Sequence, residues 1–340
     1  MSKRISTGIL AYGMSGKVFH APFVAAHDGF EFRAVVERSK KQAAEDYEGI
    51  ISYDSIEELI ADPAIELVVV NTPNYLHYEH TRMALLAGKH VLTEKPFAAT
   101  AAEAQELFDL ARQQNRKVLV YHNRRWDSDF LAIKNVLDSG KIGTPIEAHF
   151  RYDRYRPAIG PKFFKEQPYE ASGLQYDLGP HLLDQAITLF GAPLAFNKVL
   201  SANRPGTAVD DYFHIQLRYE NNFCVFLTSS LLAAEPQAGF VLHGTRGSFI
   251  KNRTDVQETQ LLQHIKPTDP GYGIEGDGQD GQLTIITEKG EKHTERIKPQ
   301  SGNYLGLFDA VYEAIVNNVP YPVQEEQVIE QLKILEAPAD

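Results

Sequence analysis

The sequence has little cysteine, no long apolar run and no excess of positive charge. Its one cysteine, Cys224, excludes an internal disulfide, and its place in an apolar segment predicts a packed rather than a reactive thiol. No apolar run reaches the roughly 18 residues of a membrane span, and no signal-peptide core follows the first residues. A formal net charge of -11, with no basic stripe and no set of zinc ligands, argues against nucleic acid and metal as partners. We therefore expect a cytoplasmic protein.

The length and the apolar content predict two domains. With 340 residues and 43% hydrophobic side chains, the chain can bury a large core but is long for one domain. The pattern of the sequence changes near residue 125, so we expect one domain over 1–125 and a second over 126–340. The last helix belongs to the second of these ranges, but it can pack back on the first domain.

Apolar strands and amphipathic helices alternate through the first 125 residues. Strands are expected at 5–11, 32–36, 67–71, 90–93 and 117–121, with helices between them. Two of these helices begin at predicted capping motifs, Asp54-Ser55-Ile56-Glu57 and Thr100-Ala101-Ala102-Glu103. Such alternation predicts an α/β fold with a doubly wound parallel sheet of the Rossmann type, and ligands bind at the carboxyl ends of its strands. Three polar segments fall there: Thr72-Pro73-Asn74, Glu94-Lys95-Pro96 and His122-Asn123-Arg124-Arg125.

A glycine-containing turn follows the first strand. The segment from Ala11 to Gly16 has the form A-x-G-x-x-G, in which Ala11 replaces the usual first glycine. Gly13 would let the backbone approach a pyrophosphate, and Gly16 would allow close packing of helix on strand. A tight turn without a ligand would look similar. The cofactor contacts expected from this segment are Tyr12, Gly13, Met14, Ser15 and Gly16.

The end of the second strand bears on the choice between NAD and NADP. Glu37 lies 24 positions after Gly13, near the spacing at which a carboxylate binds ribose hydroxyls and favours NAD. Arg38, Ser39, Lys40 and Lys41 follow directly, and cations and a hydroxyl there favour the 2'-phosphate of NADP. The residues alone leave both cofactors open.

A candidate acid–base pair lies at 177–181. Pro180 suits a first helical turn, and the apolar residues that follow have helical spacing up to Gly191. We therefore expect His181 in the first turn of a helix, where the helix dipole disfavours the imidazolium and Asp177 favours it. The alternative is a capping aspartate and a core histidine.

The period changes to that of strands from Ile146 onward. Strands are expected at 146–152, 198–203, 211–219, 222–230, 239–243, 247–251 and 283–287, with a hairpin turn at Glu220-Asn221. They predict a C-terminal α/β domain with a mostly antiparallel open sheet. One face would pack on the helix from Pro180, and the other needs a partner, so a homo-oligomer, a dimer or a tetramer, is expected.

Taken together, these motifs resemble the Gfo/Idh/MocA family of NAD(P)-dependent oxidoreductases over nearly the whole chain. The segments Phe19-His20-Ala21-Pro22, His122 to Asp127 and Asp177 to Gln185 further resemble its branch of NADP-dependent scyllo-inositol 2-dehydrogenases. The resemblance implies a Rossmann domain, an antiparallel α/β domain and NADP as cofactor, with NAD as the alternative. It implies catalytic roles for Lys95, Asp177 and His181, and it adds Thr72, Pro73, Asn74, His77, Glu94 and Lys95 to the cofactor contacts.

The residue types fit the oxidation of a secondary alcohol. His181 is the candidate base, Asp177 would orient it or bind a neighbouring hydroxyl, and Lys95 would donate to the reacting oxygen. We expect a cyclic polyol or sugar as substrate, with scyllo-inositol and its 2-keto counterpart leading. The alternatives are another sugar or a dihydrodiol, or a non-catalytic dinucleotide-binding sensor. Side chains expected to bind the substrate are Arg124, Trp126, Tyr155 and Tyr176.

Overall fold

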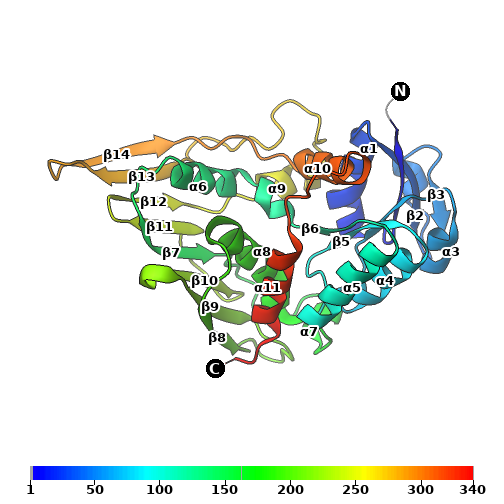
Figure 1. Ribbon diagram of the computed structural model, residues 1–340, viewed down its shortest axis with the longest axis horizontal. Coiled ribbons are helices and arrows are strands. Elements are labelled where there is room, and N and C mark those ends of the chain that lie inside the picture. Colours follow the sequence, from blue (N-terminus) through cyan, green and yellow to red (C-terminus); the bar gives the residue numbers. More distant parts are fainter. Residues whose placement is uncertain (1–2, 162, 340) are drawn as a thin grey trace. The chain divides into compact units, whose positions relative to one another are not determined.

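Figure 1 shows the computed structural model of the chain, which describes residues 3–161 and 163–339. The chain divides into two compact units. Unit 1 contains the chain up to Asn123 together with Gln257–Tyr272 and Asn303–Ile329, and unit 2 contains Arg124–Val256, Gly273–Gly302 and the chain from Glu330. Each unit has its own sheet.

The sheet of unit 1 has six parallel strands in the order β3-β2-β1-β4-β5-β6. Because this order reverses between β1 and β4, the crevice at the carboxyl ends of these two strands is where ligands bind in such sheets. Every residue of both strands is buried, as expected for strands covered on both faces. The strands are β1 (Ile5–Ile9), β2 (Phe30–Val36), β3 (Ile51–Tyr53), β4 (Leu67–Val70), β5 (His90–Glu94) and β6 (Val118–Tyr121).

The helices of unit 1 begin where the sequence supplies caps. Ser55 and Thr100 each accept a hydrogen bond from the backbone of a glutamate three positions on, and the carboxylate of that glutamate accepts one in return. The motif at Thr100 is as predicted, and the one predicted over Asp54–Glu57 lies one residue later, at Ser55 and Glu58. The helices are η1 (Gly16–His20, a π-helical turn), α1 (Ala21–Ala26), α2 (Ala43–Asp46), α3 (Ile56–Ala61), η2 (Asn74–Leu76), α4 (His77–Leu86), α5 (Ala101–Gln113) and α10 (Leu305–Val316). Three further helices, η3 (Asn123–Trp126), α9 (Val256–Leu262) and α11 (Glu325–Glu336), cross from one unit to the other.

An aromatic cluster fixes α10 to the first helix of unit 1. Phe23 stacks on Phe308 with ring centroids 5.4 Å apart, and Tyr304 lies 5.9 Å from Phe23. All three side chains are fully buried. Burial of such rings stabilises the packing by several kcal/mol in order of magnitude, which explains why a segment far along the chain belongs to this unit.

The sheet of unit 2 has eight strands in the order β14-β13-β12-β11-β7-β10-β9-β8. All neighbours are antiparallel except β7 and β10, which run parallel. The strands are β7 (Pro145–Arg151), β8 (Ala195–Ser201), β9 (Tyr212–Arg218), β10 (Cys224–Ser230), β11 (Phe240–Gly244), β12 (Gly247–Lys251), β13 (Gly281–Ile286) and β14 (Lys292–Ile297). The turn predicted at Glu220-Asn221 joins β9 to β10 as the 3-10 turn η4 (Glu220–Asn222). Strand β14 was not among the strands predicted from the sequence.

One face of this sheet is covered by helices. Alternate side chains of β7, β9 and β10, such as Phe150, Ile215 and Leu227, are fully buried, while their neighbours are half-exposed. The helix α8 (Gly173–Phe190) packs against β9 and β10, and α6 (Ser128–Asp138) packs against β12. The remaining helix of unit 2 is the short α7 (Phe163–Glu166).

The start of α8 differs from the prediction. The helix begins at Gly173, and Pro180 lies inside it, so His181 is not in the first turn. Asp210 explains the earlier start, because its carboxylate accepts a 2.7 Å hydrogen bond from the backbone N–H of Gln175 in the first turn. Gly173 is required beside it: its φ is +85°, and a Cβ there would lie 2.0 Å from the carboxylate. The expectation that the helix dipole acts on His181 was therefore wrong.

Candidate functional site

The phosphate-binding loop predicted in unit 1 is built where β1 and β4 end. The Asn71 side chain bridges the two ends, since it accepts from the Ala11 N–H at 2.9 Å and donates to the Ala11 carbonyl at 2.8 Å. Gly16 packs so closely on this carbonyl that a Cβ would lie 2.1 Å from the oxygen. Gly13, in contrast, has open space where a Cβ would be. The loop thus has the tight glycine packing of a dinucleotide-binding turn, held by an asparagine.

The other predicted residues of this loop face different surroundings. The Tyr12 hydroxyl donates to Asp46 at 2.8 Å, and Met14 is 43% exposed. Ser15 donates to the Glu94 carboxylate at 3.0 Å, so the loop is joined to the end of β5. The tight turn and the exposed loop residues leave its backbone N–H groups suited to an anionic group.

Glu94 is the centre of a small buried cluster. The Nε2 atom of His20 lies 2.9 Å from the same carboxylate oxygen that Ser15 contacts, and the His20 ring lies 4.4 Å from the Tyr121 ring. Burial alone would raise the pKa of Glu94, but its hydrogen bond and charge interaction with His20, the charge of Lys95 and the hydrogen bond from Ser15 hold that pKa below its usual value. The end of β5 thus places Lys95 directly after Glu94, whose carboxylate is ionised and held in one orientation.

The end of β2 has its carboxylate turned inward. Glu37 is buried, accepts backbone hydrogen bonds from Gln42 at 2.8 Å and Ala43 at 3.2 Å, and accepts the Ser52 hydroxyl at 2.8 Å. The Arg38 and Ser39 side chains are exposed, and neither has a hydrogen bond or an ion pair with another described residue. The carboxylate oxygens of Glu37 thus already accept hydrogen bonds, whereas the donor groups of Arg38 and Ser39 are exposed to solvent.

The loop after β4 is held by two histidines. His77 is buried, with Nδ1 2.7 Å from the Pro96 carbonyl and Nε2 2.8 Å from the Thr72 carbonyl. The Thr72 hydroxyl lies 2.9 Å from Nδ1 of His80. His77 therefore connects the segment Thr72-Pro73-Asn74 to the segment after Lys95, both of which the sequence placed at the cofactor. These contacts give His77 a role in supporting the loops.

In unit 2, α8 presents three polar residues on consecutive turns. His181 lies four positions after Asp177, and Asp184 lies seven positions after Asp177. This is the spacing of residues on one helix face. Asp177 is half-buried and forms an ion pair of 2.6 Å with Lys165, while His181 is buried. A carboxylate and an imidazole one turn apart can hold and move a proton at a hydroxyl.

Asp184 closes this face with a buried ion pair. Arg125 donates to its carboxylate through Nε at 2.8 Å and Nη2 at 2.6 Å, and Gln331 donates at 3.0 Å. Asp184 is 1% exposed, so it is not a solvated charge on an open helix face. The pair fixes α8 to the segment 124–126 and to α11.

The residues predicted to bind the substrate differ in their burial and in their contacts. Arg124 is buried and donates to Asp255 at 2.6 and 2.7 Å and to Asp127 at 3.1 Å, which accounts for its charge without a substrate. Tyr155 is 59% exposed, Tyr176 is 9% exposed and Trp126 is half-buried. Their roles at a substrate stay predictions.

Four residues near these sites were not assigned a role from the sequence: Asn71, His20, Lys165 and Asp255. Asn71 had a usable signal, because a buried asparagine at the end of an apolar strand must have partners. The other three form contacts across long sequence separations or irregular segments, for which no local pattern exists.

The described part of the chain contains no group of three or more His, Cys, Asp or Glu side chains placed to hold a metal. Among its helices, none is both long enough and apolar enough to cross a membrane.

Comparison with known proteins matches both parts of the chain. The family model "Oxidoreductase family, NAD-binding Rossmann fold" (GFO_IDH_MocA) matches residues 5–122, and the model of the C-terminal alpha/beta domain of this oxidoreductase family matches residues 134–339. The chain is 38% identical to the uncharacterized oxidoreductase YdgJ of Escherichia coli, over 99% of this chain and 96% of that protein.

A second relative is scyllo-inositol 2-dehydrogenase (NADP(+)) IolW of Bacillus subtilis, 37% identical over 98% of this chain and 92% of that protein. Among solved structures, the putative oxidoreductase yvaA of Bacillus subtilis superposes with a TM-score of 0.92 at 36% identity, covering 98% of this chain and 96% of that one. With both domains matched and relatives aligned over almost their whole length, this chain belongs to the Gfo/Idh/MocA family of oxidoreductases.

Proposed function

We propose that the protein catalyses reversible hydride transfer between NADP and a secondary alcohol of a cyclic polyol, with scyllo-inositol and its 2-keto counterpart as the leading pair. The observation that carries the proposal is the face of α8, where Asp177 and His181 lie on consecutive turns. The 37% identity to an NADP-dependent scyllo-inositol 2-dehydrogenase over 98% of the chain supports the choice of substrate.

The residues of unit 1 fit a dinucleotide. The close approach of Gly16 to the Ala11 carbonyl and the open space at Gly13 suit a loop that receives a pyrophosphate. The inward Glu37 carboxylate and the exposed Arg38 and Ser39 suit a 2'-phosphate, because that carboxylate is already saturated with donors. NADP is therefore the proposed cofactor, and it supplies the acceptor of the hydride when bound.

The side chains of this chain supply the proton chemistry. His181 takes the proton of the reacting hydroxyl, Asp177 holds the substrate or the imidazole in position, and Lys95 donates to the oxygen as negative charge develops on it. Glu94, the residue before Lys95, is an ionised carboxylate, because its contacts with His20 and Ser15 lower its pKa. In the opposite direction His181 returns the proton to the ketone oxygen.

A panel of inositols, aldoses and ketoses, assayed with NADP and NAD by absorbance of the reduced nicotinamide, tests the proposal. Reduction of NADP with scyllo-inositol, and oxidation of NADPH with the keto-inositol, are expected. Turnover of an aldose or a dihydrodiol alone would refute the inositol assignment and leave the oxidoreductase. Binding of NADP without turnover of any member would favour the dinucleotide-binding sensor.

We also infer a homo-oligomer, a dimer or a tetramer, from the uncovered face of the sheet of unit 2. Phe226 stacks between His149 and His214 on that face, at 4.8 and 5.8 Å, and Ile250 is 40% exposed there. Light scattering of the purified protein should give a multiple of the 38.1 kDa chain mass, and a monomer at all concentrations would refute the inference. The cytoplasmic location stays a prediction.

A further inference from the structure

Lys165 is the partner of the carboxylate that we place in the active site. Its ammonium nitrogen lies 2.6 Å from the Oδ1 atom of Asp177, and the two side chains are 36% and 23% exposed. Both groups can therefore be reached from solvent. Among the described residues the Lys165 ammonium donates to Asp177, and an ammonium has three N–H donors in all.

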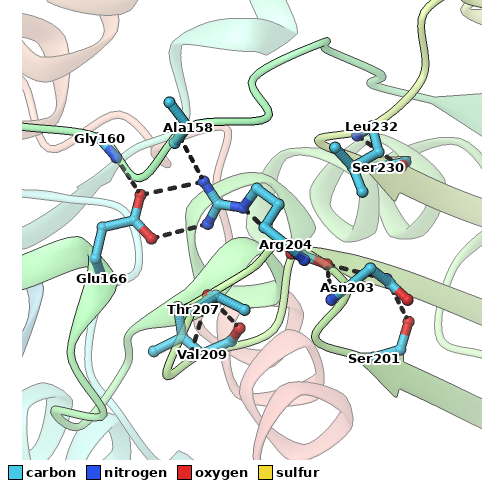
Figure 2. A network of polar contacts seen from close by, with 11 residues as sticks. Ala158, Gly160, Glu166, Ser201, Asn203, Arg204, Thr207, Val209, Ser230 and Leu232 are labelled. Carbon is cyan, nitrogen blue, oxygen red and sulfur yellow. Dashed lines mark hydrogen bonds and ion pairs between the residues drawn. The ribbon is translucent and has the colours of Figure 1, made fainter.

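The residue after Lys165 is held by a buried arginine, as Figure 2 shows. Arg204 donates to the two carboxylate oxygens of Glu166 at 2.8 and 3.4 Å and to the Ala158 carbonyl at 3.2 Å. The Gly160 N–H donates to the same carboxylate at 3.0 Å. The segment before α8 is thus fixed at Glu166 by contacts that a solvated loop would lack.

Arg204 is itself fixed to the sheet of unit 2. Its Nε atom donates to Asp211 at 3.2 Å, and the exposed fractions of the three side chains are 2% for Arg204, 11% for Glu166 and 0% for Asp211. An exposed lysine–carboxylate pair is ordinarily weak because two flexible side chains must be ordered. Here the backbone of Lys165 is positioned through its neighbour, so less conformational entropy is lost when the pair forms.

The pair combines a group that only accepts hydrogen bonds with a group that only donates them. A hydroxyl can do both, and two hydroxyls on adjacent ring carbons lie about one hydrogen-bond length apart. The carboxylate of Asp177 can accept from one hydroxyl while the ammonium of Lys165 donates to the oxygen of the next. A single alcohol or a deoxy position uses only half of such a pair.

We propose that Lys165 and Asp177 together bind two adjacent hydroxyls of the substrate, so that Lys165 is a binding residue that selects a vicinal diol. This inference rests on the proposed function, since it places the substrate of that reaction at Asp177. The anchor of Arg204 on Glu166 positions Lys165 for this contact.

The test compares the 2-keto-inositol with its mono-deoxy analogues in the wild type and in Lys165→Met, because the carbonyl marks one ring carbon and makes the analogues distinct compounds. Lys165→Met should lower kcat/KM for the keto-inositol by about 10-fold or more, the cost of losing a charge-assisted hydrogen bond. At least one deoxy analogue should be unaffected, because it lacks the hydroxyl that Lys165 contacts. Lys165→Arg should recover part of the loss.

Lys141→Met is the matched control. Lys141 forms an ion pair of the same length, 2.6 Å, with Glu295 in the same unit and is 47% exposed, but we give it no role at the substrate. It should leave every kcat/KM value unchanged. If Lys165→Met lowers the values for the keto-inositol and all its deoxy analogues equally, or changes none of them, the proposal is wrong while the proposed function stands. If the wild type turns over no polyol, both are wrong.

Glu166→Gln tests the anchor without touching the ammonium. It should raise KM for the keto-inositol with the same dependence on the deoxy position as Lys165→Met, but by a smaller factor. An unchanged KM in folded protein, checked by circular dichroism, would refute the positioning role of Arg204 and Glu166.

Discussion

The buried ion pair of Asp184 and Arg125 permits a quantitative prediction on stability. Asp184→Ala removes a carboxylate that is 1% exposed and leaves a guanidinium, 7% exposed in its side chain, without that partner. Breaking a buried pair on one side costs about 3–5 kcal/mol, because the remaining charge stays buried. Arg125 also loses two hydrogen bonds of 2.8 and 2.6 Å, and Gln331 loses one of 3.0 Å.

For a unit of 150–250 residues, about 1 kcal/mol corresponds to a change of roughly 2–4 °C in Tm, so Tm should fall by roughly 6–20 °C. Differential scanning calorimetry measures this, and guanidinium unfolding followed by fluorescence checks it. Asp184→Asn should fall between wild type and Asp184→Ala, because the amide keeps one acceptor. Asp138→Ala, which removes the exposed pair of Lys134 on α6, is the control and should leave Tm unchanged. A Tm for Asp184→Ala equal to that of the control would refute the reasoning.

Three further predictions concern the cofactor, the pH dependence and the reaction. Arg38→Ala should raise KM for NADP by about 10-fold or more and leave KM for NAD nearly unchanged, while Lys41→Ala, which removes a side chain already paired with Asp54, changes neither; equal effects on both cofactors would refute the 2'-phosphate contact. Burial and then the charge of Asp211 raise the pKa of Asp210 to about 6 against an unfolded value near 3.8, so the folded protein binds more protons between these values and its stability falls as pH rises through them, by at most about 3 kcal/mol; Asp210→Asn should abolish this component of the pH dependence in urea unfolding, and an identical pH profile would contradict it. Lys95→Ala should lower kcat by about 10²-fold with the KM for NADP within a few-fold, and near wild-type turnover in folded protein would remove Lys95 from the mechanism.

The alternation of strands and helices in the first 125 residues was enough to predict the parallel sheet, because buried strands and capped helices leave local signals. The capping motifs at Ser55 and Thr100 and the tight packing of Gly16 were readable for the same reason. The division near residue 125 stays our proposal for the domain boundary. The membership of α10 in unit 1 depends on the contact of Phe23 with Phe308, which no local pattern encodes.

The start of α8 was predicted wrongly for a physical reason. Proline at 180 is typical of a first turn, but here the helix continues upstream because Asp210, 35 residues from Gln175, supplies the acceptor for its first backbone N–H groups. The spacing of Asp177 and His181 was nevertheless readable, since four positions fall on one helix face wherever the helix begins. The pairing of Lys165 with Asp177 was not, because it joins residues 12 positions apart across an irregular segment.

The origin of the hydride tests the central claim most directly. Wild-type protein is incubated with NADP and scyllo-inositol deuterated on its ring carbons, and the reduced cofactor is analysed by mass spectrometry beside that formed by His181→Ala. NADPH formed by the wild type should carry one deuterium from the ring, transferred as deuteride, and His181→Ala should form it at about 10²-fold lower rate. Reduced cofactor without deuterium, or an equal rate in the variant, would contradict it.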